Sequence, residues 1–94
     1  MINELSTKVT DFFYDYDPYE FKDNYNCYND GLEEVQRVLS SKSGVKELIF
    51  NLKEINDDLY GDDDKEIKLF YDRSTSLIEE LKIYEKSLKE DYEL

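Results

Sequence analysis

The stretch EIKLFYDRSTSLIEELKIYEKSL, residues 66–88, carries the longest periodic pattern in the chain. Its core-type residues recur at steps of three and four, which places them on one face of an α-helix. They are Ile67, Phe70, Tyr71, Ser74, Leu77, Ile78, Leu81, Tyr84 and Leu88. The pattern predicts a helix that begins after Asp64 and lasts for about six turns, the longest in the protein. The acids that follow, Glu90, Asp91 and Glu93, lie at the negative end of the helix dipole and favour fraying.

The upstream chain contains three shorter stripes with the same spacing. They are Ile2, Leu5, Val9, Phe12, Phe13 and Tyr16 in the first, Leu32, Val35, Val38 and Leu39 in the second, and Val45, Leu48, Ile49, Leu52 and Ile55 in the third. Ser43 is the predicted N-cap of the third, Phe50 beside it is expected in the core, and Gly61 permits the turn that follows. Strand-like alternation is weak throughout. We therefore expect an all-α fold: one small bundle of about four helices, a single domain spanning residues 1–94.

A proline marks the end of the first stripe. Pro18 disfavours the helical conformation of the residue before it, so the first helix is predicted to end near Asp17. Asp17 then serves as a candidate N-cap for a short helical turn over residues 18–23, with Glu20 at the spacing of a capping box. The asparagine-rich segment 24–30 is predicted to be a loop, closed by the glycine that follows it.

The chain is short and strongly acidic. Its 94 residues include 24 Asp and Glu against 12 Lys and Arg, for a net charge of −12. This length supports one modest core and leaves little room for a large buried active site. A negative field attracts a basic partner and repels polyanions, so direct binding of nucleic acid or of an anionic membrane is not expected.

Signals for export, membrane insertion and disulfide formation are missing from the sequence. The first residues show no basic segment followed by an apolar one, and no apolar run approaches the roughly 20 residues that span a bilayer. Cys27 is the sole cysteine, so no disulfide forms within the chain. Because no basic residue flanks it, we expect a buried or half-buried structural cysteine. These features predict a cytoplasmic protein.

Histidine is absent, which removes the commonest general base and the commonest transition-metal ligand. Nucleophile pairs that depend on histidine are therefore excluded. Paired carboxylates alone could hydrolyse glycosides, but they need a sugar cleft that a small helical domain hardly provides. The sequence predicts a protein that is not an enzyme, with no catalytic residue and no cofactor.

The stretch NDDLYGDDDKE, residues 56–66, holds six carboxylates and raises the question of a calcium loop. Such a loop needs oxygen ligands at alternating positions, glycine at the sixth and glutamate at the twelfth. A loop that starts at Asp57 has Leu59 at its third position and Asp62 at its sixth, and one that starts at Asp58 fails in the same way. No metal site is predicted. The stretch is a solvated acidic hinge, with loose divalent binding by its three consecutive aspartates as the alternative.

The excess negative charge is concentrated in two segments. Residues 11–30 and residues 57–66 each hold six acidic residues and one lysine, a net charge of −5 in each. Clustering of this kind favours a surface directed at something basic. Tyrosines, which are enriched at binding interfaces, lie among the acids. The candidate partner-binding residues are Asp15, Asp17, Tyr19, Glu20, Asp23, Tyr25, Asp57, Asp58, Tyr60, Asp62, Asp63 and Asp64.

Helical carboxylates can imitate the spacing of phosphates. Carboxylates one turn apart are separated by about 6 Å, and two phosphate steps along a DNA strand advance about 6.8 Å. In size, charge, tyrosine content and lack of catalytic residues, the chain resembles the small acidic proteins that phages and mobile elements use against host defence nucleases, including anti-CRISPR and anti-restriction DNA mimics. These proteins share no common motif, so the resemblance assigns no role to a particular residue.

A second resemblance is local. The segment DPYEFKD, residues 17–23, followed by two helical stretches, is similar to an accessory domain of large polyvalent proteins from Gram-positive mobile elements. The similarity covers residues 17–56 at most, and that domain has no assigned chemistry. It implies a mobile-element origin rather than a mechanism. A phage-encoded protein of this kind would act in the host-cell cytoplasm.

Three hypotheses for function follow. The first is an inhibitor that binds a basic nucleic-acid-binding site of a host defence nuclease or nuclease–RNA complex, with a CRISPR effector as the first candidate, through negative-charge mimicry. The second is an immunity protein or antitoxin that blocks a basic toxin. The third is a structural module in which the long helix pairs with a partner through Leu77, Leu81, Tyr84 and Leu88. The sequence leaves the oligomeric state and the identity of the target open.

Overall fold

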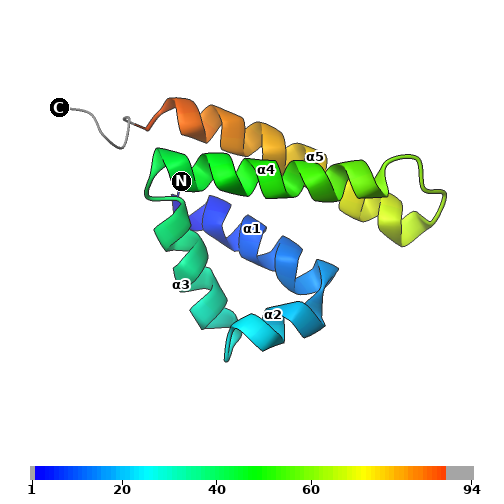
Figure 1. The fold of residues 1–94 in the computed structure, drawn as a ribbon, viewed down its shortest axis with the longest axis horizontal. Helices are drawn as coiled ribbons and strands as arrows, with labels where there is room; N and C mark the ends of the chain where they lie inside the picture. The colour runs from blue at the N-terminus through cyan, green and yellow to red at the C-terminus, as the bar shows by residue number, and fades with distance from the viewer. Residues whose placement is uncertain (1, 89–94) are drawn as a thin grey trace.

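The computed structural model describes residues 2–88, and these form five α-helices with no strand among them (Figure 1). The helices are α1 (Ile2–Tyr16), α2 (Pro18–Asn24), α3 (Tyr28–Val38), α4 (Lys42–Leu59) and α5 (Lys65–Lys86). The all-helical class is confirmed, and α5, with 22 residues, is the longest helix, as predicted. The predicted number of about four is one too low. The tail acids Glu90, Asp91 and Glu93 lie outside the described residues.

The additional helix is α2, which was predicted only as a short turn. Its N-cap is confirmed: Asp17 Oδ1 accepts a hydrogen bond from the Glu20 backbone N–H at 3.1 Å, with Pro18 at the start of the helix. The Asp17 N–H donates to the Phe13 carbonyl at 3.1 Å, so α1 leads directly into α2. Phe21 is buried on the inner face of α2. The helix covers the whole segment predicted as a short helical turn, residues 18–23, and extends one residue beyond it.

The predicted loop at 24–30 is wrong over its second half, because α3 already begins at Tyr28. Tertiary contacts explain the early start. The Tyr28 hydroxyl donates to Asp11 Oδ1 on α1 at 2.6 Å. Gly31 closes no loop; it lies inside α3 against the Phe21 ring, where an added Cβ would stand 2.3 Å from Cζ. Glycine here allows α2 and α3 to approach closely.

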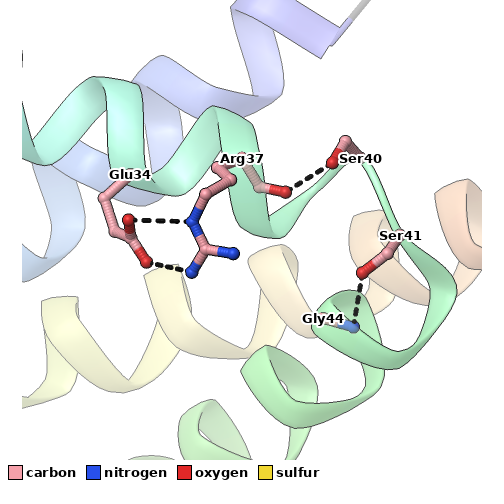
Figure 2. A network of polar contacts seen from close by, with 5 residues as sticks. All are labelled: Glu34, Arg37, Ser40, Ser41 and Gly44. Atoms are coloured by element: carbon pink, nitrogen blue, oxygen red, sulfur yellow. Dashed lines mark hydrogen bonds and ion pairs between the residues drawn. The ribbon is translucent and has the colours of Figure 1, made fainter.

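The N-cap of α4 is Ser41 rather than the predicted Ser43. Ser41 Oγ accepts a hydrogen bond from the Gly44 backbone N–H at 3.1 Å (Figure 2). Ser43 lies inside the first turn of the helix. The turn is tight, since a Cβ on Gly44 would stand 2.2 Å from the Val38 carbonyl oxygen. Gly44 lets the first turn of α4 fold back against the end of α3.

The core forms where α1, α4 and α5 meet, with α3 packed on α1 and α4 packed chiefly on α5. Its buried members are Leu5, Val9, Phe12, Leu39, Val45, Leu48, Ile49, Leu52, Leu77, Ile78 and Leu81. All belong to the predicted stripes. The hypothesis of a structural module required Leu77, Leu81 and Tyr84 to contact a partner. In the structure Leu77 and Leu81 face this core instead, and the Tyr84 hydroxyl donates to the Leu39 carbonyl at 2.7 Å.

Two predicted burials are wrong. Phe50 is 60% exposed, because it follows Ile49 on α4 and so points about 100° away from the inward face. Cys27 is also exposed, since it occupies the N-cap position of α3 at the outer corner between α2 and α3. Neither residue contributes to the core.

Candidate partner-binding surface

The two acidic segments approach each other where α1 ends. The C-terminal end of α1 and the α4–α5 loop both lie toward the right of the view in Figure 1. Tyr16, the last residue of α1, has its ring centroid 5.6 Å from that of Phe70 on α5. The pKa of Tyr16 is raised, first by burial and then by the negative charges of Asp58 and Asp17. The pKa of Tyr16 is therefore affected by one carboxylate from each acidic segment.

A groove of about 550 Å³ begins beside Tyr16 and is bounded by α1, α2, α3 and α4. Its apolar lining residues are buried or half-buried: Phe13, Phe21, Val35, Val38, Leu48 and Ile55. Five carboxylates share the lining: Asp17, Glu20, Glu34, Glu54 and Asp58. No Lys or Arg occurs among the described residues that line it. We call this feature the acidic groove.

Tyr25 also lines the acidic groove, and its pKa is shifted in the same direction as that of Tyr16. Its pKa is raised by burial and by Glu34, while Arg37 opposes the shift. Tyr25 also packs on Phe21, with ring centroids 5.0 Å apart. Of the twelve candidate residues from the sequence, Asp17, Glu20, Tyr25 and Asp58 line this groove.

Some carboxylates are already paired within the chain. Glu34 accepts a hydrogen bond from Arg37 Nε at 3.0 Å, and this contact lowers the pKa of Glu34 (Figure 2). Asp15, a candidate binding residue, forms an ion pair with Arg73 at 3.2 Å. The Arg73 guanidinium also lies 5.5 Å from the centroids of the Phe12 and Phe70 rings. Asp15 thus offers less free charge to a partner than the sequence indicated.

The α4–α5 loop contains two kinds of aspartate. Asp64 caps α5, since its Oδ1 accepts from the N–H groups of Glu66 at 2.8 Å and Ile67 at 3.2 Å. Asp62 Oδ1 accepts from the Asp64 N–H at 2.9 Å. These two carboxylates hold the loop in shape. All three aspartates of the loop are exposed, as are Asp57 and Asp58, which lie in the last turn of α4.

The remaining candidates lie outside the acidic groove. Tyr19 is 82% exposed on α2, and Asp23 is exposed on the same helix. Tyr60 ends α4 with 75% exposure, and its ring centroid is 5.9 Å from that of Tyr71. Gly61 adopts φ +80° beside it, which confirms the predicted hinge. Each acidic segment therefore carries an exposed tyrosine, Tyr19 in one and Tyr60 in the other.

Sequence reasoning missed two carboxylates of the groove, Glu34 and Glu54. Neither belongs to an acidic cluster in the sequence, and the fold brings them to the groove on α3 and α4. A signal existed for Glu54, which precedes Asp58 by four residues and so lies on the same face of α4. Glu34 gave no such signal.

A second hollow, of about 490 Å³, provides a contrast. Its lining mixes charges, with Lys8 and Arg73 beside Asp11, Asp72 and Glu80. Lys8 Nζ lies 3.2 Å from Glu80 Oε1. Two cations accompany three carboxylates there, whereas the described lining of the acidic groove has five carboxylates and no cation.

Within residues 2–88, no three Asp, Glu or Cys side chains are placed to hold a metal ion together. Over the same residues, no helix has both the length and the apolar character required to cross a membrane. No known protein family, curated protein or solved structure matches this chain. Its candidate function is therefore argued from charge and geometry alone.

Proposed function

We propose that this protein inhibits a host defence nuclease by binding its basic nucleic-acid-binding site, with a CRISPR effector as the first candidate. The observation that carries the proposal is the set of exposed carboxylates Asp57, Asp58 and Asp63, together with Glu20 of α2, which lines the same groove as Asp58. A site lined with Lys and Arg would meet these carboxylates as it meets a phosphate backbone. The protein acts by occupancy rather than by catalysis.

The arrangement of the carboxylates supports mimicry. Glu54 and Asp58 are one turn apart on α4, which gives a rise of about 6 Å between them, close to two phosphate steps along a strand. Asp64 and Asp62 fix the loop that follows through backbone hydrogen bonds. A preorganised array loses little conformational entropy on binding.

Exposed tyrosines extend the resemblance to nucleic acid. Tyr19 and Tyr60 are 82% and 75% exposed, so their rings are available to a partner. Aromatic faces supply contacts of the stacking type that bases make, and they also attract Arg. The net charge of −12 steers the encounter with a basic site and disfavours nucleic acid itself as a ligand.

The test uses two triple variants with the same change in net charge. The first is Asp57→Lys, Asp58→Lys and Asp63→Lys at the proposed surface, which spares the capping aspartates. The control is Glu33→Lys, Glu47→Lys and Glu79→Lys, three exposed positions on other faces. We expect the first to reduce inhibition of target-DNA cleavage by a purified RNA-guided nuclease by at least about tenfold, and the control to change it little.

Binding of the wild type should also weaken steeply between low and high salt, because phosphate-like contacts are screened. Circular dichroism would establish that both variants remain helical. Equal losses in the two triple variants would show that only overall charge matters and would contradict a defined surface. Inhibition of a basic toxin but of no defence nuclease would replace this proposal with the antitoxin hypothesis.

A further inference from the structure

We infer that the acidic groove is a docking site for a basic segment of the partner protein, in which an apolar side chain lies between Lys or Arg residues. The apolar side chain would contact Val35, Val38 and Ile55, and the cations would pair with Glu54 and Asp58. This inference rests on the proposed function only in requiring a basic protein partner. Beyond that proposed function, the inference specifies the kind of segment of the partner that is bound and the site on this protein that binds it.

The carboxylates of the acidic groove favour a positively charged ligand over a negatively charged one. The five lining carboxylates face no Lys or Arg of the described lining, and only Glu34 is neutralised by a neighbour, Arg37. Burial is the main cause of the raised pKa values of Tyr16 and Tyr25; the charges of Asp58 and Asp17 add to the shift of Tyr16, and that of Glu34 adds to the shift of Tyr25. The second hollow, with its internal Lys8–Glu80 pair, lacks such an excess. A cationic group is therefore favoured in the acidic groove specifically.

The apolar lining of the groove indicates that its ligand has an apolar side chain as well as positive charge. Val35, Val38 and Ile55 are half-buried members of the groove, beside the core residue Leu48. A phosphate mimic needs no apolar surface, since phosphates make none of these contacts. A volume of about 550 Å³ lies within the roughly 300–1,000 Å³ of typical ligand pockets. It accommodates a few side chains of a segment rather than a folded domain.

The walls of the groove are held by contacts that need no ligand. Phe21 packs between Tyr14 and Tyr25, with centroid distances of 5.2 and 5.0 Å, and fixes α2 against α1. Gly31 lets the Phe21 ring lie directly on α3. On the opposite side, α4 is anchored by its packing on α5. A preformed site of this kind binds at a low conformational cost.

A peptide titration followed by methyl NMR tests the inference. The probe is the capped peptide Arg-Lys-Leu-Leu-Arg-Lys, and the controls are Arg-Lys-Ser-Ser-Arg-Lys and spermine, which carry charge without an apolar side chain. We expect the leucine peptide to shift the methyl signals of Val35, Val38, Leu48 and Ile55. The serine peptide and spermine should bind at least about threefold more weakly and leave these methyl signals in place.

Variants of the protein identify the cation positions. Glu54→Gln with Asp58→Asn should weaken binding of the leucine peptide by about fivefold, whereas Glu47→Gln with Glu79→Gln, an equal loss of charge outside the groove, should change it little. Asn51→Trp, which places a large ring in the groove without altering charge, should block the peptide. All of these positions are exposed, so the fold should be retained.

Two results would overturn the inference. Shifts confined to residues 60–64 would show that the peptide binds the loop and not the groove, and nuclease inhibition through the loop would be unaffected. Equal binding of the leucine and serine peptides, or of spermine, would show a purely ionic site. A double variant that leaves the groove lining unchanged, Asp57→Lys with Asp63→Lys, should reduce inhibition and keep peptide binding, which would separate the two surfaces.

Discussion

Tyr28 and Asp11 show how one residue pair positions a helix. The Tyr28 hydroxyl donates to Asp11 Oδ1 at 2.6 Å and so ties the start of α3 to α1. This hydrogen bond, followed by burial and the negative charges of Asp11 and Asp15, raises the pKa of Tyr28 to about 12. The neutral phenol is the form that the folded state favours.

The raised pKa of Tyr28 predicts a loss of stability at alkaline pH. Because its folded pKa lies above the unfolded value near 10.0, the contribution is fully present below pH 10 and is lost as pH rises toward about 12. We expect the wild type to be more stable than Tyr28→Phe at pH 8, and this advantage to shrink through pH 10 to 12. Urea unfolding followed by circular dichroism measures the difference at each pH.

The comparison with Tyr28→Phe removes the effects of the other ionising groups, since both proteins share them. Absorbance of tyrosinate provides a second measurement: Tyr28→Phe should lose the component that titrates near pH 12. A stability difference that stays constant from pH 8 to pH 12 would contradict the assigned role of the Tyr28–Asp11 hydrogen bond.

At the scale of the helix, neighbouring aspartates of the α4–α5 loop have different roles. Asp64 accepts two backbone N–H groups at the start of α5, while Asp63 is exposed. The first turn of a helix has N–H groups without partners inside the helix, and a carboxylate at the N-cap satisfies them and meets the positive end of the dipole. The acidic cluster is thus partly structural.

The pair Asp64→Ala and Asp63→Ala separates the two roles. Each variant loses one negative charge, but only Asp64→Ala loses the cap, so we expect it to lower the free energy of unfolding by about 1 kcal/mol. Asp63→Ala should leave stability nearly unchanged or raise it slightly. Urea unfolding measures both, and equal effects of the two substitutions would be inconsistent with Asp64 as the cap.

At the scale of the whole molecule, the net charge of −12 acts across the fold. The principal extents are 48 × 30 × 20 Å. At about 10 mM salt the Debye length is roughly 30 Å, so carboxylates repel one another across the molecule, whereas at about 150 mM it is roughly 8 Å. Self-repulsion of this kind destabilises the compact state.

We therefore expect added NaCl to raise the free energy of unfolding between about 10 and 150 mM, because it screens repulsion more than it weakens exposed ion pairs. Thermal or urea unfolding at both concentrations measures the change. Sodium sulfate at equal ionic strength serves as a check on specific ion effects. A fall in stability would mean that ion pairs such as Lys8–Glu80 and Asp15–Arg73 outweigh the repulsion.

Prediction from the sequence succeeded where signals are local and failed where packing decides. The stripes of α1, α4 and α5 are long, so their periodicity alone indicates a helix. The early start of α3 depends on Tyr28 with Asp11 and on Gly31 against Phe21, residues that meet only in the folded chain. No local pattern encodes such contacts.

For the candidate surface too, some features were predicted from the sequence and others depend on packing. The acidic segments and their tyrosines were visible in the sequence, and Asp17, Glu20, Tyr25 and Asp58 do line one groove. The pairing of Asp15 with Arg73 was not visible, because it joins α1 to α5. Glu34 also reaches the groove only through the placement of α3.

The sequence by itself determined the helical class, the charge of −12 and the lack of histidine chemistry, because periodicity and composition are properties of the chain in any conformation. Only the tertiary structure decided which carboxylates cap helices, which pair with arginine and which remain open around the acidic groove. Electrostatic interactions depend on distance in space, and packing alone brings Asp58 of one acidic segment to Tyr16, the neighbour of Asp17 in the other.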